Sequence, residues 1–165
     1  MYRFVIFILL FLVGCGEYKE PDYRLKADDV IYIHTSLTNN EAGFAKNAIQ
    51  ELRMVTGGTF NPSIATTTDS RSFVGDDARW VIKMGILPKP GHATSFSIIL
   101  DRQRIQVQAD YDGCLYEEAF KNVTLHELVH SVGVWDHEEN TFMYSNICTD
   151  IDQITTDKVC AQLGC

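Results

Sequence analysis

Hydrophobic residues along the chain follow two spacings, one typical of strands and one typical of helices. A short apolar run at residues 30–33 predicts a strand. Apolar residues then recur at helical spacing from Phe44 to Val55, and Gly57 and Gly58 end that helix. The pattern therefore begins with a strand that is followed by an amphipathic helix.

The next part of the pattern favours strands. Residues 59–67 are rich in threonine, and residues 79–87 are mostly apolar. Residues 96–100 and 104–109 are two further runs separated by Asp101-Arg102-Gln103, which predicts a hairpin. In the second run apolar residues alternate with glutamines, as expected of a strand with one face toward solvent.

Helical spacing returns in the last third of the chain. A helix is predicted at residues 116–132, and the tail after Thr155 predicts another. The order is strand, helix, four strands, helix, irregular segment and helix. This order predicts an α+β fold in which helices pack against one sheet.

Composition limits the class of protein. The 165 residues suit one domain with a short appendage, and 11 glycines and 4 prolines are too few for a collagen-like or low-complexity chain. The net charge is −8 and no cluster of lysine or arginine is visible, so we expect no nucleic-acid partner. A mean hydropathy of −0.07 excludes a multi-span membrane protein.

The amino terminus has the pattern of an export signal. Arg3 precedes an apolar run at residues 4–13, which as a helix is only about 15 Å long and therefore too short to span a bilayer. Leu12-Val13-Gly14-Cys15 resembles the lipobox of bacterial lipoproteins. The resemblance implies a signal peptide at residues 1–14, acylation of Cys15 and a lipid-anchored tether at residues 15–27.

Two further expectations concern this segment. Gly16 after the cysteine implies, by the same resemblance, sorting to the outer rather than the inner membrane. The alternative is an ordinary secretory signal with an incidental cysteine.

Four other cysteines follow, and an even number in an exported chain predicts two disulfides with three pairings open: Cys114, Cys148, Cys160 and Cys165.

The candidate chemistry lies at residues 126–143. His126 and His130 are four residues apart on the predicted helix, so both imidazoles lie on one face and can bind one metal ion. Glu127 is placed beside such a metal, where it can accept a proton from water. A pentad of this kind is expected by chance roughly 0.01 times in a chain of this composition.

The residues after this pentad extend the pattern. Gly133 can adopt a positive φ and turn the chain back, and Asp136 and His137 follow it, ahead of Met143. The whole pattern resembles that of the metzincin metallopeptidases, with features similar to matrixins and to snapalysin. The resemblance implies a catalytic domain at residues 28–165, with one twisted, mixed, five-stranded sheet, two long helices, a Met-turn at Met143 and a C-terminal helix.

The resemblance also implies a site and an activity. Zn²⁺ is held by His126, His130 and Asp136, with His137 as the alternative third ligand, and Glu127 is the catalytic base. The chain is then expected to be a monomeric zinc metalloendopeptidase that hydrolyses extended peptide substrates lying along an edge strand at residues 94–100. Two alternatives remain open: a non-catalytic, zinc-stabilised binding lipoprotein at the cell surface or in the periplasm, and a hydrolase of non-peptide amides.

Overall fold

The computed structural model describes residues 24–68, 80–84, 96–97, 104–107, 114–144 and 148–165. Its elements are β1 (Val30–His34), α1 (Asn39–Val55), β2 (Ser63–Thr67), β3 (Trp80–Met84), β4 (Phe96–Ser97), β5 (Arg104–Val107), α2 (Tyr116–Ser131) and α3 (Gln153–Leu163). The predicted signal peptide, Cys15 and all but the last residues of the tether lie outside the described residues. Among the residues described, no helix has both the length and the apolar character needed to cross a bilayer.

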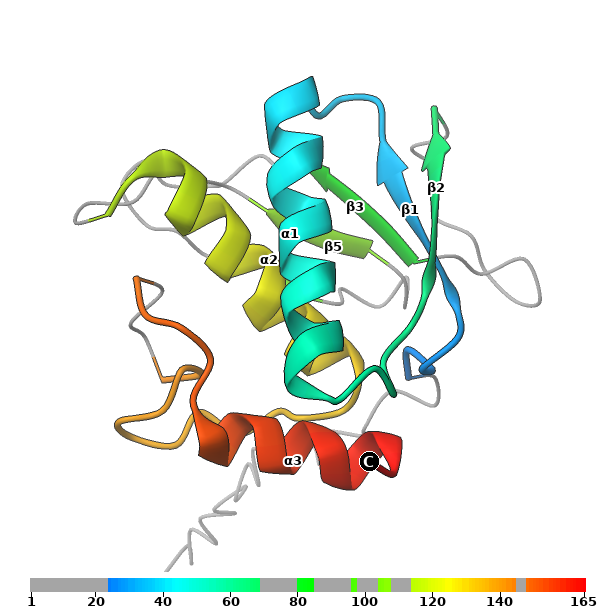
Figure 1. The fold of residues 1–165 in the computed structure, drawn as a ribbon. Helices are drawn as coiled ribbons and strands as arrows, with labels where there is room; N and C mark the ends of the chain where they lie inside the picture. Colours follow the sequence, from blue (N-terminus) through cyan, green and yellow to red (C-terminus); the bar gives the residue numbers. More distant parts are fainter. Residues whose placement is uncertain (1–23, 69–79, 85–95, 98–103, 108–113, 145–147) are drawn as a thin grey trace, which may run out of the picture.

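The strands form one sheet in the order β2-β1-β3-β5-β4 (Figure 1). β1 is parallel to both β2 and β3, β3 is parallel to β5, and β4 is antiparallel to β5. The first parallel pair follows from the chain path, because α1 connects β1 to β2 and returns the chain to the end at which β1 began. Trp80, Val81 and Ile82 of β3 are all buried, so both faces of this strand are covered.

The fold predicted from the sequence is corrected by this arrangement. One twisted, mixed, five-stranded sheet with two long helices, a Met-turn and a C-terminal helix was expected, whereas the structure has three helices and a sheet built on the parallel strands β2, β1 and β3. β5 continues the parallel arrangement, and β4 adds two antiparallel residues. Alternating apolar residues show which side chains face a core, but they do not show the direction of the neighbouring strand. The loop of the predicted hairpin, residues 98–103, lies outside the described residues.

Hydrogen bonds fix the start of α1 and join it to α2. Thr38 and Glu41 form a capping box, in which the Glu41 N–H donates to the Thr38 hydroxyl and the Thr38 N–H donates to the Glu41 carboxylate. The Tyr116 hydroxyl, at the start of α2, also donates to Glu41 at 2.5 Å. This bond lowers the pKa of Glu41, and burial together with the carboxylate raises the pKa of Tyr116 to about 12.

The helices α1 and α2 pack side by side against the sheet, and α3 lies across one end of this pair (Figure 1). α2 is buried over most of its length, and its apolar side chains join the core of the domain. The residues that α2 gives to this core are Phe120, Val123, Leu125, Leu128 and Val129. The helix that carries the two predicted ligands is therefore held in place by packing on several sides.

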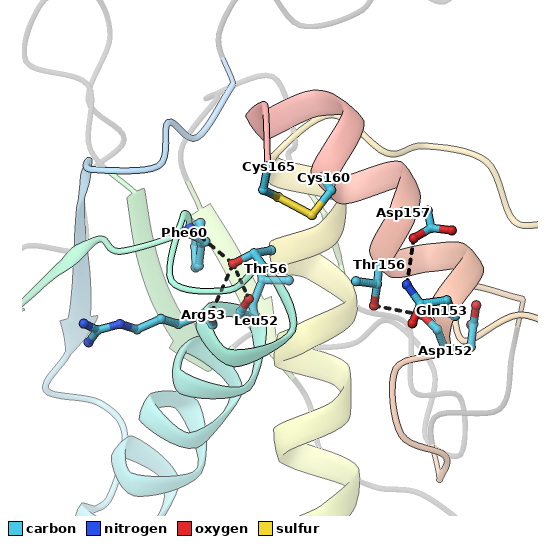
Figure 2. Close-up of a disulfide and its surroundings, with 10 residues drawn as sticks. All are labelled: Leu52, Arg53, Thr56, Phe60, Asp152, Gln153, Thr156, Asp157, Cys160 and Cys165. Atoms are coloured by element: carbon cyan, nitrogen blue, oxygen red, sulfur yellow. Dashed lines mark hydrogen bonds between the residues drawn. A yellow bond between two sulfur atoms is a disulfide. The ribbon is translucent and has the colours of Figure 1, made fainter.

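The four cysteines form two disulfides, as predicted, and the structure selects the pairing. Cys114, just before α2, is bonded to Cys148, just before α3, across 34 residues. Cys160 is bonded to Cys165 across 5 residues, around the left-handed Gly164 that ends α3 (Figure 2). At the end of α1, Figure 2 also shows the buried Thr56 hydroxyl donating to the Leu52 carbonyl. One disulfide thus joins two distant segments and the other closes a helix end.

The two disulfides are expected to differ in their effect on stability. In the chain-entropy treatment, closing a loop of 34 residues stabilises the fold by about 4 kcal/mol, and closing one of 5 residues by about 2 kcal/mol. Replacing Cys114 and Cys148 together by serine should therefore lower the free energy of unfolding more than replacing Cys160 and Cys165. Urea unfolding of both double variants measures the difference, and the opposite ranking would contradict it.

Candidate metal centre

Two histidines of α2 share one face of the helix. The ring centroids of His126 and His130 are 4.6 Å apart, which is the neighbouring position expected of residues four apart in a helix. Between them, Leu128 and Val129 are fully buried in the core. The packing of these apolar side chains fixes the rotation of α2 and with it the direction of both imidazoles.

A turn at Gly133 ends α2 and reverses the chain. Gly133 has a φ of +109°, its N–H donates to the His130 carbonyl, and the Val134 N–H donates to the Val129 carbonyl. A Cβ atom at this position would lie 2.9 Å from the flexible Arg24 side chain, which would have to shift, so glycine is favoured here mainly by the positive φ. The prediction of a chain-reversing glycine here is confirmed.

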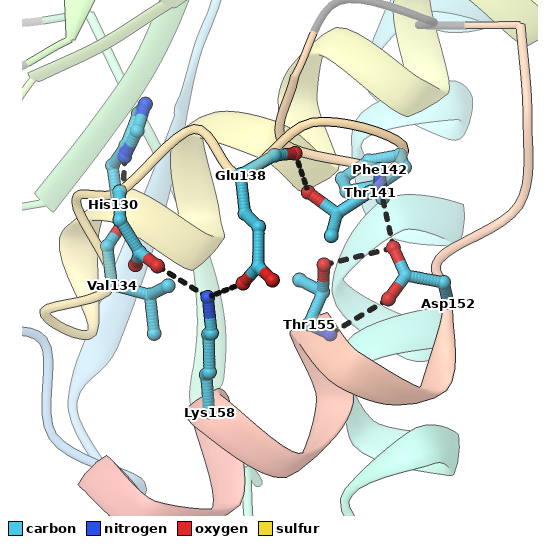
Figure 3. Close-up of polar contacts among 9 residues, drawn as sticks. His130, Val134, Glu138, Thr141, Phe142, Asp152, Thr155 and Lys158 are labelled. Atoms are coloured by element: carbon cyan, nitrogen blue, oxygen red, sulfur yellow. Dashed lines mark hydrogen bonds and ion pairs between the residues drawn. The ribbon is translucent and has the colours of Figure 1, made fainter.

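The same turn orients His130. Its Nδ1 lies 2.8 Å from the Val134 carbonyl oxygen (Figure 3). A carbonyl oxygen only accepts, so Nδ1 carries the proton and the lone pair of Nε2 is available to a metal. The indole of Trp135 stacks on the face of this imidazole, with ring centroids 5.2 Å apart and planes inclined by 11°.

His137 completes a group of three histidines. One ring nitrogen from each of His126, His130 and His137 lies within 4.8 Å of the others, so the three can hold one metal ion. The His137 ring centroid is 5.3 Å from that of His126 and 4.9 Å from that of His130. His130 is buried, His126 is partly buried and His137 is exposed, so the group opens to solvent on the His137 side.

The structure places the two candidates for the third ligand in different surroundings. Asp136 was preferred and His137 was the alternative, but the Asp136 carboxylate pairs with Lys158 of α3, which also bonds to Glu138 at 2.6 Å. The hydrogen bond from Lys158 lowers the pKa of Asp136 and keeps it ionised in this pair.

Burial keeps the two helix histidines neutral. Burial, assisted by the positive charge that neighbouring imidazoles would carry, lowers the pKa of His126 to about 3. Burial also lowers the pKa of His130 to about 4, although the bond to the Val134 carbonyl favours its charged form. A metal ion binds the neutral imidazole, so at pH 7 it displaces no proton from either ring.

The donors of this group suit zinc. Three imidazole nitrogens form an established catalytic zinc set, and such sets leave one position for water or substrate. The buried Nδ1 of His126 has no hydrogen-bond partner among the residues described, which is uncommon for a buried polar atom. Either ring nitrogen can bind a metal, so the chemistry of this group fits a metal ion.

The other predicted site residues lie close to this group in the chain. Glu127 is 1% exposed, and it follows His126 directly on α2. Met143 is 2% exposed, in a turn at residues 141–144 whose Phe142 ring lies 6.1 Å from the His126 ring. A buried Met143 is what a Met-turn requires, although its burial also suits an ordinary core residue.

Asp152 holds this turn against the start of α3. Its carboxylate accepts from the N–H groups of Phe142 and Thr155 and from the Thr155 hydroxyl (Figure 3). Burial raises the pKa of Asp152, but these hydrogen bonds outweigh it, so the pKa lies below its usual value. A single carboxylate therefore caps α3 and positions the segment next to His126.

Three contributors to the site were not found from the sequence: the Val134 carbonyl, the stacked Trp135 and Lys158. A backbone carbonyl leaves no signal in a sequence, and Lys158 lies 22 residues from Asp136 on a separate helix. The stacking of Trp135 on His130 depends on the path of the chain after Gly133.

No protein-family model matches the chain, and no curated protein matches it in sequence. The function is therefore inferred from the residues and geometry of this chain.

The third ligand can be identified by metal content. His137→Ala should lose bound zinc on dialysis against a weak chelator, because two imidazoles remain from a set of three. Asp136→Ala should retain the metal, because its carboxylate lies on Lys158 and not among the three histidines. Zinc retained by His137→Ala and lost by Asp136→Ala would show that the ligand is Asp136.

Proposed function

We propose that this protein is a zinc-dependent endopeptidase of the metzincin type. The observation that carries the proposal is the convergence of His126, His130 and His137, with a buried glutamate one residue after the first of them. A structural zinc site normally closes its fourth position with another protein ligand. An exposed His137 beside the buried His130 and the partly buried His126 favours a site that remains open to a substrate.

Each residue of the proposed site has a chemical role. The three histidines hold the ion, and the Val134 carbonyl keeps the His130 ring in the tautomer that binds it. Zinc in such a site acts as a Lewis acid on a carbonyl and lowers the pKa of water. Glu127 accepts a proton from water at its carboxylate and delivers it to the leaving amine.

The sheet offers a place for an extended substrate. β4 lies at one edge of the sheet, and its described residues Phe96 and Ser97 fall within the segment predicted to bind substrate, residues 94–100. A peptide can add to an open edge through main-chain hydrogen bonds, with little dependence on its side chains. The proposed substrates are therefore extended segments of peptides or proteins.

The proposal includes export and a lipid anchor. The lipobox-like sequence that ends at Cys15 supports acylation of this cysteine, and the two disulfides suit an oxidising compartment outside the cytoplasm. We place the protein at a bacterial membrane, in the outer rather than the inner one, because Gly16 follows the cysteine. The anchor would hold the site close to the membrane surface through a short tether.

The role of Glu127 can be tested with an isosteric change. Glu127→Gln should bind zinc with normal stoichiometry but lose about 10²- to 10⁴-fold in peptide hydrolysis, because only proton transfer is removed. Glu118→Gln, on the exposed first turn of the same helix, is the matched control and should keep full activity. Cleavage of a peptide library, with and without a chelator, provides the assay.

Two outcomes would contradict the proposed activity. Near-normal turnover by Glu127→Gln would refute the assigned base. Tight zinc binding without any chelator-sensitive cleavage by the unaltered protein would favour the zinc-stabilised binding lipoprotein.

The anchor can be tested separately. Cys15→Ser should move the protein from the membrane fraction to the soluble fraction without changing the activity of the folded domain, because acyl chains supply the membrane affinity. Fractionation in high salt removes proteins that are held only by charge. A variant that still sediments with membranes under these conditions would show that Cys15 is not the anchor.

A further inference from the structure

We infer that Lys158 is a positioning residue that holds His137 at the metal centre, an inference that rests on the proposed zinc site. Lys158 belongs to α3 and has no place in the motif that predicts the site. It acts through the residues on either side of His137 and does not itself contact the three histidines in any interaction described here.

The geometry of the segment after Gly133 supports this role. Asp136 and Glu138, the two neighbours of His137, both bond to the Lys158 ammonium group. Figure 3 shows the bond to Glu138, which has a length of 2.6 Å. One cation of α3 thus holds the side chains on both sides of His137, while the His137 ring lies with His126 and His130.

His137 is the ligand that most needs such support. The other two ligands lie on α2, whose apolar residues are fixed in the core, whereas His137 lies in a segment with neither helical nor strand hydrogen bonding. This segment is bonded at its ends, where Val134 joins the end of α2 and the Glu138 carbonyl accepts from Thr141. Between these ends, the ion pairs of Lys158 limit the conformations that the segment can adopt. Less conformational entropy is therefore lost when His137 binds a metal.

The backbone of α3 is held in place around this lysine. Its first turn is capped by Asp152, and its last turn is closed by the disulfide between Cys160 and Cys165. Val159, next to Lys158, is fully buried in the core. The backbone of Lys158 is therefore fixed, and this limits where its ammonium group can bind the carboxylates of Asp136 and Glu138.

The expected effect is moderate. Asp136 and Glu138 are each more than half exposed, with side-chain exposures of 57% and 53%, and exposed ion pairs are individually weak and are screened by salt. Residues that orient metal ligands from outside the coordination sphere typically change metal affinity by about 10- to 100-fold. Partial exposure puts the expected loss at the lower end, about 10-fold.

The test is the zinc affinity of the purified protein, measured by competition with a chromogenic chelator at low salt and at 1 M NaCl. Lys158→Met should bind zinc about 10-fold more weakly at low salt, and the difference from the unaltered protein should shrink at 1 M NaCl because salt screens the ion pairs. Lys158→Arg keeps the charge and should restore most of the affinity. Lys121→Met is the matched control, because it removes an ion pair between α2 and Glu51 of α1 and should leave zinc affinity unchanged.

A second variant tests the same ion pairs by replacing the two carboxylates instead of the lysine. Asp136→Asn with Glu138→Gln should reproduce the loss seen in Lys158→Met, and adding Lys158→Met to this pair should cause little further loss. If Lys158→Met does not fold, this double variant supplies the test. A far larger loss in the carboxylate variant than in Lys158→Met would overturn the inference, because it would indicate that Asp136 binds the metal directly.

The remaining outcomes separate this inference from the proposed function. Equal zinc affinity in Lys158→Met and the unaltered protein would overturn the role of Lys158 and leave the zinc site in place. An equal loss in Lys121→Met would also overturn it, because the effect would then be general destabilisation. Failure of the unaltered protein to bind zinc would overturn the proposed site itself.

Discussion

The turn at Gly133 is the constraint on which the candidate metal centre depends. It ends α2 directly after His130, presents the Val134 carbonyl to the Nδ1 atom of that histidine and sends the chain back past the helix face. The positive φ of +109° strains any residue with a side chain at this position and so favours glycine. The orientation of His130 and the position of His137 near it therefore both depend on a single backbone conformation.

The rest of the domain limits movement around this turn. α2 is held by its apolar neighbours in the core, and α3 is capped by Asp152, which also binds the backbone next to Met143. The disulfide between Cys114 and Cys148 connects the segments that precede these two helices. The packed part of the fold thus surrounds His126 and His130, whereas His137 lies in an exposed segment.

The sequence predicted the parts of the site that are local in the chain. His126 and His130 lie together because helical spacing places residues four apart on one face, and Gly133 turns the chain as expected. Asp136 was the third ligand implied by resemblance, with His137 as the alternative. The structure places the His137 ring with the other two and pairs the Asp136 carboxylate with Lys158. That outcome depends on a contact between α3 and a distant loop, and the sequence does not encode it in any spacing.

The same distinction holds for the fold. The helices at Asn39–Val55 and Tyr116–Ser131 lie where apolar spacing predicted them, because this spacing reports burial along one element. The antiparallel pairing of β4 with β5 agrees with the predicted hairpin, but the parallel direction of β1, β2 and β3 was not predicted, since it depends on how the connections pass over the sheet. Disulfide pairing was likewise open among three possibilities until the cysteine positions in space were known.

The central claim, a zinc centre formed by three histidines with one open position, is tested most directly by X-ray absorption spectroscopy of the zinc-loaded protein. The account predicts three imidazole ligands with zinc–nitrogen distances of about 2.0–2.1 Å and one further light atom. Removing His137 should reduce the imidazole scattering from three rings to two. A spectrum of the unaltered protein with only two imidazoles and a carboxylate, or with sulfur in the coordination sphere, would contradict the account.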